Sequence, residues 1–435
     1  MTATGLITAA LVLGTLLATA LYVRAARRRE GESASVLERS LREGLAEPAS
    51  LHPVIDPSKC IGCGSCVEAC PEQKVLGLVD GRAQLIGPSH CIGHGACRTA
   101  CPSSAIMLVF GTETRGVDIP FVTASFETNV PGIFIAGELG GMGLIRNAFE
   151  QGRQAVEAIR KLDGIGGPEH LDLVIVGAGP AGFSASLAAK QAGLRFVTLE
   201  QDSLGGTVAH YPRGKIVMTA PGRLPLIGKV PFTETSKEKL MEFLRGAERD
   251  AGIAIRYRER VESVERNGSG FVVKTPRDSY RGRAVLLAIG RRGTPRRLGV
   301  EGEELPKVTY RLIDPEQYRG GRVLVVGGGD SAIEAAVAIA QEPETQVTLS
   351  YRSASFSRVK QENRRRLAEA ESAGRIRVLL ESEVRRIDSA AVHLEHGGRR
   401  IELQNDAVIV CAGGVLPTPF LRTMGIEVET KFGTS

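Results

Sequence analysis

The stretch "LDLVIVGAGPAG" (Leu171–Gly182) decides the fold of this chain. Its first half is apolar and β-branched, as in a buried strand, and Gly177, Gly179 and Gly182 then follow as G-x-G-x-x-G. The first glycine permits a tight turn, the second admits a pyrophosphate, and the third lets helix and strand pack closely. A small-residue helix comes next, and a second strand, "FVTLE", ends at Glu200. This complete pattern predicts a dinucleotide-binding domain in which Glu200 accepts ribose hydroxyls.

A second copy of the pattern, "RVLVVGGGDSAIEAAVAIA", spans residues 322–340. Its three small residues are Gly327, Gly329 and Ala332. Ala in the third place is common where the bound nucleotide is nicotinamide. The following strand leads to Arg352 instead of a carboxylate, and Arg358 comes soon after. Arginines can pair with a 2′-phosphate, which favours NADPH over NADH, although both side chains also suit a plain charged surface.

Seven of the eight cysteines lie between Cys60 and Cys101. The run "CIGCGSCVEACP" at 60–71 has the spacing C-x2-C-x2-C-x3-C-P, and "CIGHGACRTACP" at 91–102 repeats it with His94 in place of the second cysteine. Such tight clustering indicates a metal site in a reducing compartment rather than a disulfide framework. The spacing is typical of bacterial iron–sulfur proteins, and two clusters fit it better than zinc.

In this spacing the fourth cysteine of each run ligates the other cluster. The first 4Fe-4S cluster should therefore use Cys60, Cys63, Cys66 and Cys101. The second should use Cys70, Cys91, Cys97 and His94, because imidazole can also ligate iron. The alternative is that His94 does not bind and that the second cluster contains three irons. Between the runs, "VDGRAQLI" predicts a hairpin with an Asp-Gly turn.

The first 23 residues contain no charge, and "RAARRR" follows at once. A stretch of about 20 apolar residues can span a membrane, and positive charge flanks the cytoplasmic end of such a span. We therefore expect an anchor over residues 1–24, with membrane lipid around it, in the cell inner membrane, and the catalytic domains in the cytoplasm. The alternative is a signal peptide cleaved after Ala18-Thr19-Ala20. Residues 25–51 should form an exposed helical stalk or linker.

The composition is that of ordinary globular domains, with 43% hydrophobic residues and a net charge of +6. No dense basic face with interleaved aromatics is visible, so the sequence does not suggest nucleic-acid binding. Each of the two halves that begin with a glycine pattern ends with a further apolar strand. These strands are "AVLLAIGRRG" at 284–293 and "DAVIVCAGG" at 406–414.

These paired halves resemble the thioredoxin-reductase-like flavoproteins of the pyridine nucleotide-disulfide oxidoreductase class. The resemblance implies FAD in the first half and NAD(P)H in the second. The stretch "GGTVAHYPR" at 205–213 further resembles the flavin-side loop of ferredoxin–NADP reductases and bacillithiol disulfide reductases of that class. Residues 52–110 resemble two-cluster bacterial ferredoxins.

One segment of this class is in an unexpected place. "TNVPGIFIAGELGGMGLIRNAFEQG", residues 128–152, resembles the end of the FAD domain but precedes its first strand. Circular permutation explains this order, and a decayed partial repeat is the alternative. Gly137 and Glu138 should then approach the FAD, although the family has Asp where Glu138 stands. The helix that begins near Ile145–Arg146–Asn147 should point its N-terminus at the flavin.

The expected fold is α/β, with two Rossmann-like dinucleotide-binding domains, a small α+β dicluster ferredoxin domain and an N-terminal transmembrane helix. After the anchor and the stalk, we expect the ferredoxin domain at 52–111, the permuted segment at 112–160, the FAD domain at 161–294, the NAD(P) domain at 295–415 and a return to the FAD domain at 416–435. The expected FAD contacts are Gly137, Glu138, Ile145, Arg146, Asn147, Gly177, Gly179, Pro180, Ala181, Gly182, Glu200, Gly205, Gly206, Thr207 and Gly290. The expected NAD(P) contacts are Gly327, Gly329, Asp330, Ser331, Ala332, Arg352 and Arg358.

The nicotinamide half contains only Cys411 and thus lacks the C-x-x-C of thioredoxin reductases. Ala181 stands where bacillithiol-type relatives have Cys. The resemblance therefore implies electron flow from NAD(P)H through FAD and the clusters to a carrier protein, a membrane redox complex or quinone, or flow in reverse. No catalytic acid or base is named, because His210 and Tyr211 suit packing as well as flavin contact. The alternatives are an external disulfide reductase and a non-enzymatic redox sensor, and a homodimer is also considered.

Overall fold

The structure, a computed structural model, describes residues 3–42, 48, 51–72, 74–141, 143–211, 213, 216–218, 222–230, 232, 234–356 and 359–433. It divides into two compact units. Unit 1 comprises Met1–Arg115 and Phe432–Ser435, and unit 2 comprises Gly116–Lys431. The border differs slightly from the predicted one after residue 111, because residues 112–115 and the last four residues belong to unit 1.

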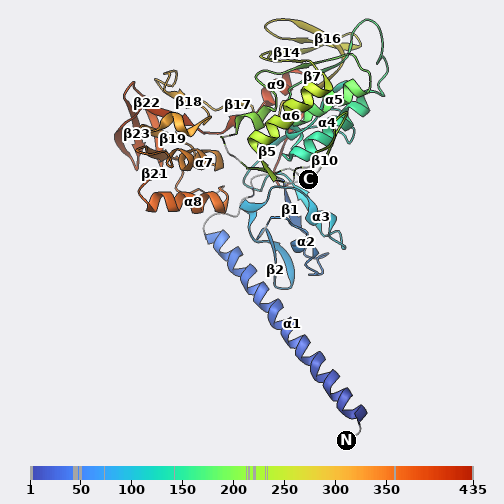
Figure 1. Cartoon of the computed structure of the whole chain (residues 1–435), viewed down its shortest axis with the longest axis vertical. Helices are drawn as coiled ribbons and strands as arrows, with labels where there is room; N and C mark the ends of the chain where they lie inside the picture. Colours follow the sequence, from blue (N-terminus) through green and yellow to red (C-terminus); the bar gives the residue numbers. More distant parts are fainter. Residues whose placement is uncertain are drawn as a thin grey trace. The chain divides into compact units, whose positions relative to one another are not determined.

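Unit 1 begins with one continuous helix, α1 (Ala3–Arg42), drawn in blue in Figure 1. Its C-terminal half packs on the unit: Ser40 Oγ donates to the carbonyl of Ile86 at 2.8 Å, and the Glu30 carboxylate accepts the amide of Gly81 at 2.7 Å. The expected helix is thus present and mostly exposed over residues 25–42, and Glu30 and Ser40 tie it to the rest of the unit. In the part of the chain that is described, no helix combines the length and the apolar character needed to cross a membrane, so the predicted transmembrane helix is not supported.

The rest of unit 1 is built on the two cysteine runs. Each run forms a loop followed by a single helical turn, α2 (Ser65–Glu68) and α3 (Ala96–Thr99). Strand β1 (His52–Ile55) pairs antiparallel with β4 (Ile106–Val109). Strand β2 (Leu76–Val79) pairs with β3 (Arg82–Leu85), and η1 (Pro88–His90) follows.

The β2–β3 hairpin turns through Asp80 at φ 52° and Gly81 at φ 70°. A two-residue turn with two positive φ angles matches the right-handed twist of its strands, and Asp-Gly is a favoured pair for it. The predicted hairpin is thus confirmed.

The first half of unit 2 is a seven-stranded sheet in the order β13-β8-β7-β16-β15-β14, with β6 also paired to β16. The strands are β6 (Ile133–Ile135), β7 (Leu171–Val176), β8 (Phe196–Leu199), β13 (Ile255–Arg256), β14 (Ser263–Asn267), β15 (Gly270–Lys274) and β16 (Ser279–Leu287). Helices α4 (Ile145–Ile159), α5 (Pro180–Gln191) and α6 (Lys237–Ala251) belong to this half. Strand β7 is buried from its second residue on, as its apolar sequence predicted.

The segment at 128–152 that precedes the first strand of the FAD domain, hereafter the displaced segment, contributes strand β6 to this sheet. Strand β6 pairs parallel with the second half of β16, on the same side on which β15 pairs with the first half. Helix α4 packs closely on α5, since a Cβ at Gly152 would lie only 2.0 Å from the carbonyl oxygen of Ala181. Near the chain's end, β27 (Val428–Lys431) pairs antiparallel with β5 (Val117–Pro120).

The second half of unit 2 is a five-stranded parallel sheet in the order β18-β25-β19-β20-β21. Its strands are β18 (Val308–Thr309), β19 (Arg322–Val326), β20 (Gln346–Ser350), β21 (Ile376–Leu379) and β25 (Ala407–Val410), with helices α7 (Asp330–Ile339) and α8 (Gln361–Ser372). A three-stranded antiparallel sheet adds β22 (Ser382–Ile387), β23 (Ala391–His396) and β24 (Arg399–Gln404). The chain leaves and re-enters the first half through the paired strands β17 (Thr294–Pro295) and β26 (Gly414–Val415).

The remaining elements are short. Two antiparallel pairs are β9 (Ile216–Met218) with β12 (Glu234–Ser236), and β10 (Gly222–Leu224) with β11 (Gly228–Val230). The single-turn or short helices are η2 (Glu138–Gly140), η3 (Gly206–His210), η4 (Pro315–Tyr318) and α9 (Thr418–Thr423).

Candidate cofactor sites

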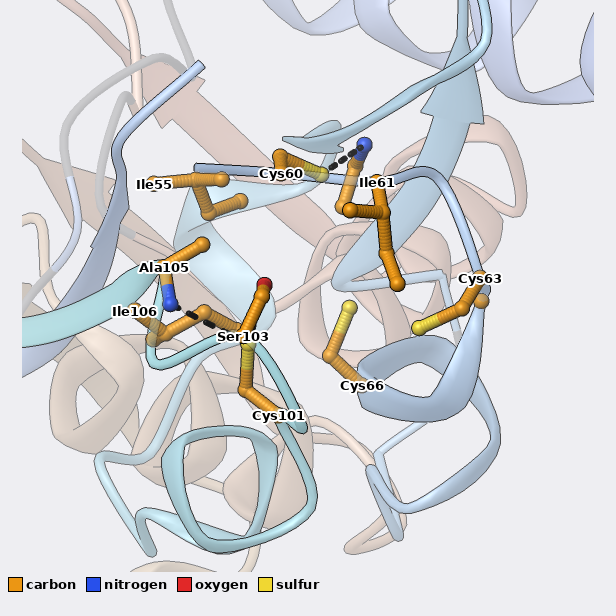
Figure 2. A pocket seen from close by; sticks show the side chains of 11 residues that line it. Ile55, Cys60, Ile61, Cys63, Cys66, Cys101, Ser103, Ala105 and Ile106 are labelled. Carbon is orange, nitrogen blue, oxygen red and sulfur yellow. Dashed lines mark hydrogen bonds between the residues drawn. The ribbon is translucent and has the colours of Figure 1, made fainter. Parts of the chain in front are cut away.

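Four cysteines from both runs line one pocket of unit 1. Its thiols are Cys60, Cys63, Cys66 and Cys101, and Figure 2 shows their side chains around the same opening. Cys101 comes from the second run, so the pocket gathers the set predicted for the first cluster.

Backbone amides point at the sulfurs of this pocket. Ala83 donates its N–H to Cys60 Sγ at 3.5 Å, and Ala105 donates to Cys101 Sγ at 3.3 Å (Figure 2). The hydroxyl and the amide of Ser65 lower the pKa of the Cys63 thiol. Such bonds favour the thiolate, which is the form that binds iron.

A second pocket of unit 1 is lined by the other predicted set. Its candidate ligands are Cys70, Cys91, Cys97 and His94. Cys70 comes from the first run, which mirrors the exchange of Cys101 into the first pocket. Glu72 also lines this second pocket and was not identified from the sequence.

His94 has a polar partner on each ring nitrogen. Its Nδ1 accepts the backbone N–H of Ala96 at 3.1 Å, and its Nε2 lies 3.7 Å from Cys70 Sγ. Burial lowers the pKa of His94, and the charge of Glu72 acts in the opposite direction.

The candidate ligands of both pockets are mostly thiols. Among the described residues, no group of three or more His, Cys, Asp or Glu side chains is close enough to hold one metal ion. A 4Fe-4S cluster is bound by four thiolates that surround it, which suits pockets lined by thiols. Burial raises the pKa of Cys66 and of Cys91 to about 11, so both are protonated at neutral pH until metal binding displaces the proton.

In unit 2 the first glycine loop has the geometry that its motif requires. Gly177 adopts φ 102°, and a Cβ there would lie 2.6 Å from the carbonyl oxygen of Ala288. A Cβ at Gly182 would lie 1.8 Å from the Gly177 oxygen. The nearest atom to a Cβ at Gly179 is instead the Cα of Gly206, at 3.9 Å. Gly179 therefore leaves a cradle that a dinucleotide can approach, at the start of helix α5 with Pro180 and Ala181.

Glu200 lies at this loop and is 5% exposed. Its carboxylate accepts the amides of Ala178 at 2.7 Å and Asp202 at 2.9 Å. Burial raises the pKa of Glu200, and these amide bonds oppose the shift.

The loop of Gly205, Gly206 and Thr207 contacts the first glycine loop, because a Cβ at Gly206 would lie 3.1 Å from the Cα of Gly179. A Cβ at Gly290 would lie 4.0 Å from Thr207 Oγ1. The structure thus brings these predicted FAD residues together.

The Gly137–Glu138 turn joins them from the displaced segment. A Cβ at Gly137 would lie 2.9 Å from the Ala181 methyl group, and the Gly137 amide donates to Gln151 Oε1 at 2.8 Å. Helix α4 begins at Ile145, as predicted, and continues through Arg146 and Asn147.

The side chain of Glu138 is accessible to solvent, but many protein atoms lie near its carboxylate. This desolvation raises the pKa of Glu138, and the positive charges of Arg291 and Arg292 oppose the shift. Both arginines belong to "GRRG" after the closing strand, a signal that our sequence reasoning did not use.

The second glycine loop is arranged similarly. A Cβ at Gly327 would lie 2.3 Å from the carbonyl oxygen of Cys411, whereas a Cβ at Gly329 would have no neighbour within 4 Å. Asp330 and Ser331 begin helix α7, and Ala332 is buried. Asp330 accepts the amide of Lys360 at 3.0 Å.

Tyr351, which directly follows β20, contacts this loop and was not identified as a site residue from the sequence. A Cβ at Gly328 would lie 2.2 Å from its ring, and the ring stacks on Phe356 with centroids 5.4 Å apart. Arg352 is exposed after β20, and Arg358 lies outside the described residues. The pairing of either arginine with a 2′-phosphate stays a prediction.

His210 contacts both halves of unit 2. Its Nδ1 lies 2.6 Å from Arg311 Nη1, and its Nε2 lies 3.1 Å from the Asp202 carboxylate. Burial lowers the pKa of His210, and Arg311 acts in the same direction. Tyr211 packs in the apolar core beside helix α6, and burial raises its pKa.

The family model described as pyridine nucleotide-disulphide oxidoreductase matches residues 174–433, and the model described as 4Fe-4S dicluster domain matches residues 52–102. A ferredoxin–NADP reductase of Thermus thermophilus is 31% identical over 274 residues, which cover 60% of this chain and 78% of the relative. A ferredoxin–NADP reductase of Ignicoccus hospitalis is 33% identical over 42% of this chain, and the match spans only 57% of that relative.

Among solved structures, a bacillithiol disulfide reductase from Staphylococcus aureus is similar with a TM-score of 0.52 and 25% identity. The similarity covers 59% of this chain and 80% of that one. The fold that the two proteins share is an α/β dinucleotide-binding fold, in agreement with the two sheets of unit 2.

Proposed function

Since this chain belongs to the pyridine nucleotide-disulphide oxidoreductase family, we propose that it passes electrons between NAD(P)H and an electron-carrier protein, through FAD and two iron–sulfur clusters. The family supplies the two nucleotide folds. The dicluster domain at its N-terminal side supplies a one-electron route that the family fold alone does not have.

The observation that carries this proposal is the exchange of cysteines between the two pockets. Cys101 joins the first run's thiols, and Cys70 joins the second run's. Two iron–sulfur clusters require two separate pockets, each lined by three residues of one run and the fourth cysteine of the other run. A zinc ion instead needs one set of four converging ligands. The residues present thus fit the groups proposed.

The chain's own residues would hold and orient the cofactors. The open face of Gly179 and the N-terminus of α5 suit the FAD pyrophosphate, and Glu200 suits its ribose. The open Gly329 and α7 suit the nicotinamide nucleotide. When bound, FAD accepts a hydride from the nicotinamide and releases single electrons, which iron–sulfur clusters can carry. NADPH is the proposed nucleotide, because Tyr351 and Arg352 directly follow β20 at the position where NADH-binding proteins have an Asp or Glu for the ribose 2′-hydroxyl.

Circular permutation of the FAD domain is part of the proposal. It is supported by β6, which lies in the sheet beside β16, and by β27, which pairs with β5 near the chain's end. Asn129 ties the same regions together, because its side chain donates to the Gly425 carbonyl and accepts the Glu427 amide, both at 2.9 Å.

The test compares two acceptors in steady-state turnover with NADPH. Wild-type protein should reduce an added bacterial ferredoxin. The double variant Cys66→Ala, Cys97→Ala should lose this activity while it retains FAD. The proposal would be contradicted if wild-type protein did not reduce ferredoxin and the double variant still reduced a disulfide. That result would favour a disulfide reductase, the activity in the name of the similar solved structure.

A further inference from the structure

His94 occupies the position that Cys63 occupies in the first run. Each residue directly precedes a glycine that caps a one-turn helix, Gly64 at φ 78° and Gly95 at φ 79°. The backbones of the two loops therefore turn alike at this glycine, and the two predicted ligand sets differ only in the side chain at this one position.

The amide two residues further on bonds to this side chain in both runs. In the first run the Ser65 amide bonds to the Cys63 sulfur. In the second, the Ala96 amide donates to His94 Nδ1 at 3.1 Å. A nitrogen that accepts a hydrogen bond directs its lone pair at the donor, so the neutral ring carries its proton on Nε2.

That proton faces a thiol of the second pocket. Nε2 of His94 lies 3.7 Å from Cys70 Sγ, within reach of an N–H to sulfur hydrogen bond. A histidine that ligates a metal shows the reverse arrangement: one nitrogen binds the metal and the other donates its N–H to an acceptor. His94 has no unprotonated nitrogen left for iron while the Ala96 bond persists.

We infer that His94 is not an iron ligand but donates its Nε2–H to the Cys70 thiolate, and that Cys70, Cys91 and Cys97 alone bind the second cluster. The inference rests on the proposed iron–sulfur function. It makes His94 a positioning residue, and it implies a three-iron cluster in this pocket. Hydrogen bonds to cluster sulfurs raise the reduction potential, so His94 should raise the potential of the second cluster.

Histidine-specific ¹⁵N labelling tests the ligation directly. The full chain is purified anaerobically with its clusters, and pulsed EPR is recorded on the second cluster. The inference predicts the signal of an oxidised three-iron cluster and no coupling of the size that a coordinated nitrogen gives. A large ¹⁵N coupling that disappears in His94→Gln would overturn it.

Three variants separate hydrogen bonding from ligation. His94→Gln keeps an N–H donor and should keep both the three-iron signal and most of the potential. His94→Leu removes the donor and should lower the potential while the signal persists. His94→Cys restores the ligand and should replace the three-iron signal by a four-iron cluster, with one more iron per chain. Loss of the second cluster in both His94→Gln and His94→Leu would contradict the inference.

The outcomes also distinguish this inference from the proposed function. If no iron or sulfide copurifies with any variant or with wild type, the proposed function fails. If iron binds and His94 coordinates it, only the inference fails.

Discussion

Glu200 is the acid on which the assignment of the first nucleotide site depends. Burial raises its pKa in the free protein, so it takes up a proton at a higher pH than an ordinary glutamate, whose pKa is 4.5. A protonated carboxyl accepts ribose hydroxyls poorly, and FAD affinity should therefore fall on acidification at a pH above that ordinary value. FAD binding followed by fluorescence across pH measures this.

The matched variant is Glu200→Gln. It should bind FAD about tenfold more weakly or worse at neutral pH, as expected when a buried charged hydrogen bond is lost. Its affinity should also lack the acid step seen in wild type. An unchanged acid step in Glu200→Gln would show that another group titrates.

Cys66 and Cys411 offer a second contrast at the residue scale. Cys66 lines the first pocket, whereas Cys411 follows β25 in unit 2, where burial raises its pKa to about 11. We expect Cys66→Ala to lose the first cluster's visible absorbance and its share of the iron. Cys411→Ala should keep both. Equal iron content in the two variants would argue against the first pocket as a cluster site.

Individual residues were predictable where the motif is local. The cysteine runs and the first glycine loop are short motifs that identify their candidate ligands, and the exchange of Cys70 and Cys101 follows from the spacing of the two runs. Tyr351 was not predictable, because its ring meets Gly328 only after β19 and β20 pair in the sheet. The proton position of His94 was not predictable either, since it depends on an amide direction that only the folded loop sets.

The crossing of α4 and α5 is the contact through which the displaced segment joins the FAD half. Gly152→Ala places a methyl group 2.0 Å from the Ala181 carbonyl oxygen, so α4 must shift. We expect a loss of about 1–3 kcal/mol in the free energy of unfolding, together with weaker FAD retention. Thermal unfolding and flavin content report both.

Gly246→Ala is the control for this prediction. It also lies inside a helix, α6, but an added Cβ there has no neighbour within 4 Å. Alanine should stabilise this helix by up to about 1 kcal/mol. If Gly152→Ala behaved like Gly246→Ala, the close helix crossing would be refuted.

Elements with strong local signals followed the predictions, but the packing of α1 against distant residues was not predicted. The hairpin, both fingerprint strands and the start of α4 appear where the sequence patterns indicated. Helix α1 was also expected, but its polar C-terminal half packs on the β2–β3 hairpin through Glu30 and Ser40. A charged, small-residue sequence alone resembles an exposed stalk, and nothing in it specifies this partner.

At the scale of the whole molecule, the proposed permutation predicts that the natural order can be restored. A chain of residues 166–431 followed by a short glycine linker and residues 116–160 should fold and bind FAD without unit 1. It should still oxidise NADPH with an artificial dye, because every element of the two sheets is present. FAD content and NADPH–dye turnover are the measurements.

The control is the same rearranged chain without residues 116–160. It lacks β6 and α4, which occupy the sheet and the α5 surface, and it should be insoluble or free of flavin. Full flavin binding by this shorter chain would show that the displaced segment lies outside the site.

In the proposed function, one chain joins nicotinamide, flavin and iron–sulfur redox chemistry. This is tested by anaerobic titration of the purified full chain with NADPH, followed by optical and EPR spectra. The absorbance of oxidised flavin should bleach, and signals of reduced clusters should appear in the same titration. Bleaching of the flavin while the clusters of wild-type protein stay oxidised would contradict the proposed function.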